Sequence, residues 1–243
     1  MGNRRGAGRA GFAARLARWI VTGIAVFFLA AGLQAEQRLR PLDQHATVLN
    51  GLVVGSAFLI QDGIAVTNRH VVAGLRRGDT VILQASRPQG ATITARLLAL
   101  SPRMDLALLQ VPEGFLPRVA AENAPERPGL AVTAAGIDAS QGGPGPRLEV
   151  DGTVLTPRQE ISAFGPGLIA RLPGARPGFS GGPLFDRQGR LAGMVTAIRP
   201  AAGIVIASSG TRSRRARDTV DAFALRAAEV RAEVRRLLAL AGS

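Results

Sequence analysis

The chain has 243 residues, enough to bury a large hydrophobic core in one domain or in two smaller ones. It contains no cysteine, which excludes disulfides, thiolate metal sites and a cysteine nucleophile. The formal charge is +13, but the 30 basic residues are all arginines scattered along the chain, apart from "RSRRAR" at 212–217, so we expect no nucleic-acid partner.

The first 35 residues have the composition of an export signal. Five arginines precede an uncharged apolar run at 19–33, and the small residue Ala35 follows it. The run is shorter than the roughly 20 residues that span a bilayer, so we expect a cleaved signal peptide, with an uncleaved membrane anchor as the alternative. The rest of the chain should then be periplasmic or secreted, touching a membrane only through residues 19–33 if these are retained.

Short apolar strands separated by turn residues dominate residues 36–217. The 30 glycines and 15 prolines favour many turns, and little helical periodicity lies between the strands. This spacing predicts an all-β fold of barrels or a sandwich. The Pro-rich and charged stretch at 112–129 is expected to link two halves. Strands are predicted at 56–61, 64–68, 80–84, 92–100, 106–111, 130–135, 148–155, 168–172, 191–198 and 203–207.

The C-terminal residues 218–243 are expected to form one amphipathic helix packed on the domain. Asp218 is a suitable N-cap residue, and Asp221 lies three residues on, as in a capping box. A helix that binds a membrane surface or a partner is the alternative. Apolar residues recur with helical spacing at Val220, Phe223, Ala227, Val230, Val234 and Leu237.

The stretch "GFSGGPLF" at 178–185 contains a candidate nucleophile, Ser180. The pattern Gly-x-Ser-x-Gly fits an α/β-hydrolase elbow, other hydrolases and ordinary turns. A serine hydroxyl needs a base, and near neutral pH the base is usually histidine. The only histidines, His45 and His70, both precede Ser180, whereas the histidine of an α/β-hydrolase follows its serine. The α/β-hydrolase architecture is therefore excluded.

A catalytic set of the order His, Asp, Ser remains, as in chymotrypsin-type barrels. His70 ends an apolar run in "AVTNRHVV", and Asp105 immediately precedes the apolar strand of "MDLALLQV". Asp105 could accept the imidazole Nδ1–H of His70, and Ser180 would then face Nε2. His45, in "PLDQHATV", has no comparable setting, so we expect it at the surface or at a sheet edge.

The glycines around Ser180 suit an oxyanion hole. Such a hole needs backbone N–H groups that point at one spot, and the candidates are those of Gly178 and Ser180. The turn requires a backbone geometry that glycine tolerates best.

Three blocks of the chain resemble those of trypsin-like serine peptidases, most of all the HtrA/Deg-like branch. The blocks are "GSAFLIQDGIAVTNRHVV", "DLALLQV" and "GFSGGPLFDRQGRLAGMVTAI", and the resemblance covers residues 51–207. It implies a chymotrypsin-like fold of two six-stranded β-barrels with the active site between them. It also implies an endopeptidase that cleaves protein or peptide substrates through an acyl-enzyme, without cofactor or metal. His70 would be the general base, Asp105 its orienting acid and Ser180 the nucleophile.

The chain also departs from this family. Phe179 stands where digestive trypsin-like enzymes have an aspartate that pairs with a freed N-terminus, so that activation switch cannot operate here. Gly174 occupies the place of trypsin's pocket acid, which removes support for a basic P1 residue. "GIVIAS" at 203–208 resembles the strand that lines the S1 pocket, so Gly203, Ile204 and Val205 are the candidate substrate-binding residues and a small or medium aliphatic P1 is expected.

Two other functions stay open at this point. The chain could be a catalytically silent trypsin-like fold used as a binding module, or a basic module that binds membranes or nucleic acid through 212–217. We expect a stand-alone peptidase domain, because little room for the PDZ modules of HtrA proteins remains after residue 207.

Overall fold

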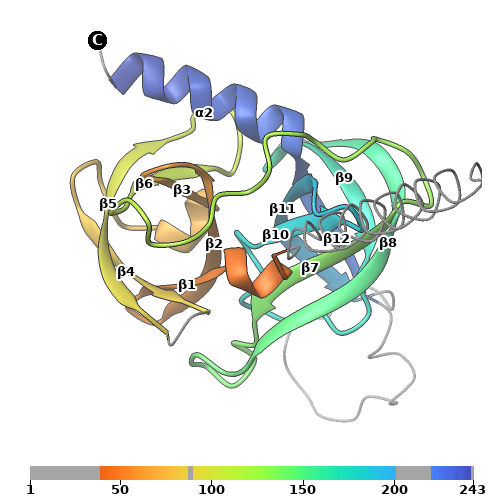
Figure 1. Ribbon diagram of the computed structural model, residues 1–243, viewed down its shortest axis with the longest axis horizontal. Coiled ribbons are helices and arrows are strands. Elements are labelled where there is room, and N and C mark those ends of the chain that lie inside the picture. Colours follow the sequence, from red (N-terminus) through yellow and green to blue (C-terminus); the bar gives the residue numbers. More distant parts are fainter. Residues whose placement is uncertain (1–38, 87–89, 201–219, 242–243) are drawn as a thin grey trace, which may run out of the picture. The chain divides into compact units, whose positions relative to one another are not determined.

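The computed structural model describes residues 39–86, 90–200 and 220–241. Within these ranges the chain forms two closed antiparallel barrels of six strands each (Figure 1). The prediction of a chymotrypsin-like double barrel is thereby confirmed. The expected signal segment at 1–35 and the candidate substrate-binding residues Gly203, Ile204 and Val205 lie outside the described residues.

The first barrel has the strand order β1-β2-β3-β6-β5-β4. Alternate side chains point inward because successive residues of a strand face opposite sides, and leucines such as Leu59, Leu83 and Leu97 fill the interior. The strand predicted at 92–100 has those bounds in the structure, whereas β1 was not predicted. The strands are β1 (Ala46–Asn50), β2 (Val53–Gln61), β3 (Ile64–Thr67), β4 (Thr80–Ala85), β5 (Thr92–Leu100) and β6 (Ala107–Gln110).

The second barrel has the order β10-β11-β12-β9-β8-β7. Its interior holds Val132, Val154, Leu168, Leu184 and Val195. The strands are β7 (Ala131–Ile137), β8 (Arg147–Ile161), β9 (Gly165–Arg171), β10 (Pro183–Asp186), β11 (Leu191–Pro200) and β12 (Val220–Arg226).

The prediction of a helix throughout 218–243 was wrong in its first part. Val220–Arg226 is strand β12, which pairs with both β11 and β9, and helix α2 covers only Ala227–Ala241. Ala222 and Ala224 face the barrel interior, while Phe223 and Leu225 face the layer between the barrels. Because both faces of β12 are buried, its residues show no polar-apolar alternation, and the requirement to close the barrel overrides the helical spacing.

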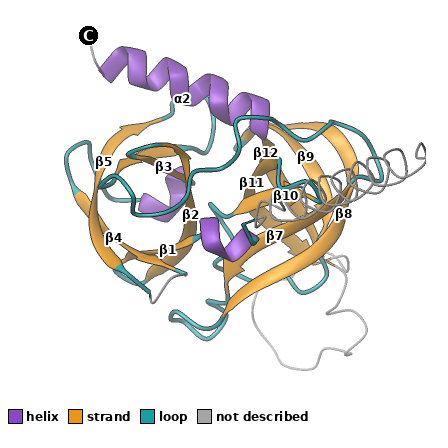
Figure 2. Cartoon of the chain, viewed as in Figure 1, coloured by secondary structure: helices purple, strands orange, loops and turns teal. Residues whose placement is uncertain are grey.

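A third hydrophobic layer joins the two barrels. It combines Phe58 and Leu108 of the first barrel with Phe185 of the second, and Val230 and Val234 of α2 cover it. Helix α2 accordingly contacts β5 of the first barrel and β11 and β12 of the second (Figure 2). No helix in the described ranges has the length and hydrophobicity needed to cross a membrane.

The expectation of a surface position for His45 was wrong, because its exposed fraction is 0%. The imidazole lies 2.5 Å from Ser86 Oγ through Nδ1 and 2.8 Å from Ser56 Oγ through Nε2. Two hydroxyl groups therefore satisfy both ring nitrogens, and the ring can be buried without leaving a polar atom unpaired. Neither serine is a neighbour in sequence, so the local pattern could not reveal this site.

Burial of His45 should make folding stability sensitive to acid. Desolvation, followed by the nearby Arg147 charge, lowers the pKa of His45 from 6.5 to about 3. Between these values the unfolded chain binds a proton that the folded chain does not, so stability falls as the pH drops from about 6.5 toward 3. The full shift corresponds to roughly 5 kcal/mol.

The measurement is the free energy of unfolding by urea across this pH range for wild type and His45→Gln. Because Asp138 and Glu233 also have lowered pKa values, the comparison between the two proteins isolates the histidine. We expect the decrease with acid to be several kcal/mol smaller in the variant; parallel curves would contradict the assignment.

Candidate active site

His70 lies on a short 3₁₀ helix, η2 (Arg69–Val72), directly after strand β3. Val71 and Val72 are buried and fix this turn on the first barrel. The Val71 methyl groups lie so close to Gly55 that a Cβ there would stand 2.6 Å from one of them. The apolar pair thus points inward and leaves the imidazole at the rim, where 46% of the side chain is exposed.

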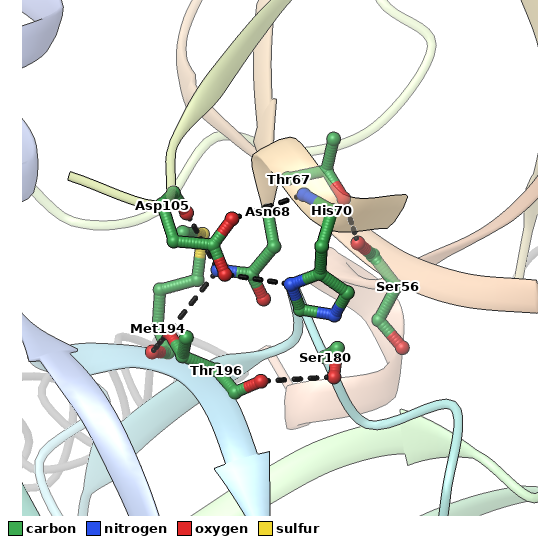
Figure 3. Close-up of polar contacts among 8 residues, drawn as sticks. All are labelled: Ser56, Thr67, Asn68, His70, Asp105, Ser180, Met194 and Thr196. Carbon is green, nitrogen blue, oxygen red and sulfur yellow. Dashed lines mark hydrogen bonds and ion pairs between the residues drawn. The ribbon is translucent and has the colours of Figure 1, made fainter. Parts of the chain in front are cut away.

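The structure pairs Asp105 with His70. One carboxylate oxygen, Oδ2, lies 2.6 Å from His70 Nδ1, and the other, Oδ1, accepts the backbone N–H of His70 at 3.0 Å (Figure 3). An ionised carboxylate is an acceptor only, so Nδ1 is the nitrogen that carries the ring proton. Nε2 is then left with a free lone pair. The side chain of Asp105 is only 7% exposed, which strengthens this interaction.

The loop that carries Asp105 is held from several sides. Ser101 Oγ accepts the N–H of Met104 at 3.1 Å and donates to Glu233 Oε1 of α2 at 2.5 Å. The N–H of Asp105 donates to the carbonyl of Phe164, in the turn between β8 and β9, at 2.9 Å. The first barrel, the second barrel and α2 therefore all fix the position of this carboxylate.

Asn68 joins the two barrels beneath the His70–Asp105 pair. Its Nδ2 donates to the carbonyl of Asp105 at 2.7 Å and to Thr196 Oγ1 of β11 at 3.1 Å, and all three residues are buried (Figure 3). Neither Asn68 nor Thr196 was predicted from the sequence. The position of Asn68, two residues before His70, was only a weak signal of its role. No local pattern indicated a role for Thr196.

Ser180 lies in the loop between β9 and β10, and the Nε2 edge of His70 faces it (Figure 3). Its hydroxyl donates to the carbonyl of Thr196 at 3.0 Å. Among the described residues, no hydrogen bond joins Ser180 to His70. The structure thus brings the three candidate catalytic residues to one place, with His70 and Asp105 in direct contact and the serine hydroxyl turned toward β11.

The loop around Ser180 is tied to both barrels. The carbonyl of Ser180 accepts the N–H of Ser56 at 2.8 Å, and the N–H of Gly181 donates to Val195 at 2.7 Å. Gly181 has φ +87°, and a Cβ there would lie 2.0 Å from the carbonyl oxygen of Ser56. Only glycine allows the chain to pass this close behind the serine.

The N–H groups of Gly178 and Ser180 have no acceptor within the described part of the chain. The carbonyl of Pro177 accepts the N–H of Ala139 at 2.8 Å, and that of Phe179 accepts the N–H of Gly182 at 2.9 Å. In a trans peptide unit the N–H points opposite to the C=O. The N–H groups of Gly178 and Ser180 therefore point away from these two anchored carbonyls and remain available to a ligand.

Phe179 anchors this loop by packing. The ring is fully buried in the core of the second barrel, against Gly136, where a Cβ would stand 2.4 Å from the ring. Burying a phenylalanine side chain contributes roughly 1.5–3 kcal/mol. An apolar contact here takes the position of the ion pair that the digestive enzymes use.

A pocket of about 590 Å³ opens beside the imidazole and the carboxylate of the His70–Asp105 pair. Arg69 and Arg103 line it together with Leu75 and Ser162.

In the described ranges, no group of three or more histidine or acidic side chains is arranged to hold a metal ion.

Comparisons with known proteins show which family the chain resembles. The family described as "Trypsin-like peptidase domain" matches residues 55–194. A "Probable periplasmic serine endoprotease DegP-like" of Brucella suis is 35% identical over 176 residues, covering 69% of this chain and 32% of that protein. One of Rhizobium meliloti is 32% identical over 198 residues, covering 79% and 35%. The chain thus spans about a third of the length of the curated relatives it matches.

Solved structures show the same fold. The serine endoprotease from Yersinia pestis superposes with a TM-score of 0.60 at 21% identity, over 84% of this chain and 65% of that chain. The Rv3671c protease from M. tuberculosis, in its active form, gives a TM-score of 0.58 at 24% identity, over 79% of each chain.

Proposed function

The chain belongs to the trypsin-like peptidase family, and on this premise we propose that it is an exported serine endopeptidase that cleaves protein or peptide substrates. The observation that carries the proposal is the Asp105–His70 pair, in which the Nε2 edge of the imidazole faces Ser180 (Figure 3). The names of the periplasmic relatives and the composition of residues 1–35 support export.

In the first half of the proposed reaction Ser180 attacks the substrate carbonyl. Its hydroxyl turns from Thr196 toward His70, and Nε2 takes the proton as the Oγ–C bond forms. Hydrogen bonds from the N–H groups of Gly178 and Ser180 stabilise the negative charge on the carbonyl oxygen. When the tetrahedral intermediate collapses, the C–N bond breaks and the imidazolium returns its proton to the leaving amine, which leaves an acyl-enzyme.

In the second half of the reaction a water molecule acts as the nucleophile. His70 Nε2 takes a proton from the water, whose oxygen attacks the acyl carbon, and the C–Oγ bond breaks as the proton passes to Ser180. Asp105 stays ionised throughout and stabilises the imidazolium while it exists.

A catalytically silent fold that only binds peptides is the second candidate. The hydrogen bond from Ser180 to the carbonyl of Thr196 favours it, because it directs the hydroxyl away from the base.

Labelling with a fluorophosphonate probe separates the two functions. The probe forms a covalent bond only with an activated serine, so we expect labelling of the full chain and none of Ser180→Ala. Ser140→Ala is the matched control, because Ser140 is an exposed serine whose hydrogen bonds among the described residues go to Asp138. If folded wild type stays unlabelled, the silent binding fold is the better description.

A further inference from the structure

A chain of hydrogen bonds leads from the buried His45 to the turn that carries the candidate oxyanion donor. His45 Nε2 lies 2.8 Å from Ser56 Oγ, and this hydroxyl donates to the carbonyl of Gly178 at 2.7 Å. At the other side of the ring, Nδ1 lies 2.5 Å from Ser86 Oγ. His45 and Ser56 both have exposed fractions of 0%, so water does not compete for these bonds.

The direction of every bond in this chain is fixed by its last member. A carbonyl oxygen can only accept, so Ser56 gives its single hydroxyl proton to Gly178. Its Oγ must then accept from His45, which places the ring proton on Nε2. A neutral ring with its proton on Nε2 has an unprotonated Nδ1, and this nitrogen accepts the hydroxyl proton of Ser86.

The ring stays neutral at ordinary pH. Burial, with a smaller effect of the Arg147 charge, lowers the pKa of His45 to about 3. Arg147 lies nearby on β8, where it hydrogen-bonds Thr47 and Gln84 at 3.3 and 2.7 Å. The order of donors and acceptors therefore does not change over the pH range in which a peptidase works.

The hydrogen bond from Ser56 restricts Gly178, a residue whose backbone dihedrals would otherwise be free to change. Gly178 has φ +101°, a conformation that glycine adopts readily and from which it can also leave readily. The peptide unit before it is held by the bond from Ala139 to Pro177, and the unit after it by the bond from Ser56 to Gly178. The N–H of Gly178 shares the first of these units with the Pro177 carbonyl, and the bond from Ser56 fixes the second unit. Together the two bonds restrict both backbone dihedrals of Gly178, so that its N–H keeps one orientation.

We propose that Ser56, oriented by His45, is a positioning residue that holds the N–H of Gly178 in place for the oxyanion. The proposal rests on the function proposed above and adds a device within the first barrel that aligns a donor on the second. The backbone of Ser56 supports this assignment, since its N–H donates to the carbonyl of Ser180 and its carbonyl accepts from Thr67 Oγ1 at 2.7 Å.

Two serine substitutions on opposite sides of the same imidazole provide the test. Ser56→Ala removes the hydroxyl that reaches Gly178, whereas Ser86→Ala removes a hydroxyl bonded to the same ring without touching the turn. A misaligned oxyanion donor weakens transition-state binding more than substrate binding. We therefore expect Ser56→Ala to lower kcat by about 10–100-fold with KM within about twofold, and Ser86→Ala to change kcat by less than about threefold.

His45→Gln and the double variant His45→Gln/Ser56→Ala show whether His45 acts through Ser56. If it does, the double variant has the kcat of Ser56→Ala alone, because the path to Gly178 is already broken. The affinity for a peptide aldehyde, which forms a tetrahedral adduct, should fall in parallel with kcat/KM in each variant. Additive losses in kcat would overturn the role of His45.

Nuclear magnetic resonance of the full chain tests the positioning without any turnover. We expect the ¹⁵N shifts of His45 to show a protonated Nε2 and an unprotonated Nδ1. Ser56→Ala should move the amide resonances of Gly178 and Ser180, and Ser86→Ala should leave them in place. If wild type is not labelled by the fluorophosphonate but these shifts occur, the proposed function fails while the positioning stands.

The proposal is overturned if Ser56→Ala leaves the Gly178 amide unmoved, or if its kcat is that of wild type. It is also overturned if Ser86→Ala lowers kcat as much as Ser56→Ala does. Should Ser56→Ala fail to fold, His45→Gln serves in its place, with a loss of kcat at unchanged KM and a displaced Gly178 amide as the expected results.

Discussion

Replacement of Ser180 or His70 by alanine is expected to lower kcat by about 10⁶-fold. Ser180→Ala removes the atom that would form the acyl-enzyme, and His70→Ala removes the base that the Asp105 carboxylate orients at 2.6 Å. The two residues act on the same proton transfer, so Ser180→Ala/His70→Ala should be no slower than either single variant. Release of fluorescence from a quenched protein substrate, with the unfolding midpoint of each variant as control, measures this.

The residual rate of these variants has its own physical source. The N–H groups of Gly178 and Ser180 are backbone groups that both substitutions leave in place, so binding and oxyanion stabilisation still give about 10³–10⁴-fold over water. A loss of only a few-fold in either single variant, or a double variant far slower than both, would refute a shared catalytic unit.

Asp105→Asn is expected to lower kcat by about 10⁴-fold while leaving the fold intact. The two carboxylate oxygens accept from different groups of His70, the backbone N–H and the ring Nδ1. The side chain of asparagine has one acceptor oxygen. The backbone N–H of His70 is always a donor, so that oxygen will accept from it. The amide NH₂ then faces Nδ1, which must give up its proton to Nε2. A protonated Nε2 cannot take the proton of Ser180.

Asp151→Asn is the matched control, since Asp151 is an exposed carboxylate whose hydrogen bond among the described residues comes from Thr133 at 2.6 Å. We expect less than a twofold change in its kcat. The ¹⁵N shifts of His70 should show the proton on Nδ1 in wild type and on Nε2 in Asp105→Asn. An Asp105→Asn variant that keeps most of its activity would exclude the orienting role of the carboxylate.

The strand spacing predicted an all-β fold of barrels or a sandwich, and the resemblance to trypsin-like peptidases implied two barrels, as the structure has them. Turn residues bound the apolar run of strand β5, so both ends of this strand could be predicted. The order of His70, Asp105 and Ser180 along the chain selected one topology among the hydrolases. His70 follows strand β3, and Asp105 and Ser180 precede strands β6 and β10, each within a short recognisable motif.

The features that the sequence did not predict depend on contacts between distant segments. Strand β12 has the apolar spacing of a helix, and only the open edges of β9 and β11 decide in favour of a strand. His45 looks like a surface residue until Ser56 and Ser86 are placed around it. Asn68 shows its role only when β11 brings Thr196 beneath it.

The hydrophobic layer between the barrels has a consequence for how the protein would lose activity. His70 and Asp105 belong to one barrel and Ser180 to the other, so neither barrel contains all three candidate catalytic residues. A slight rotation of one barrel against the other would separate base from nucleophile while both barrels kept every strand. If heat loosened this layer before either barrel unfolded, the proposed activity would be lost while spectroscopy still reported an intact β-structure, and recovery on cooling would require the two barrels to pack together again.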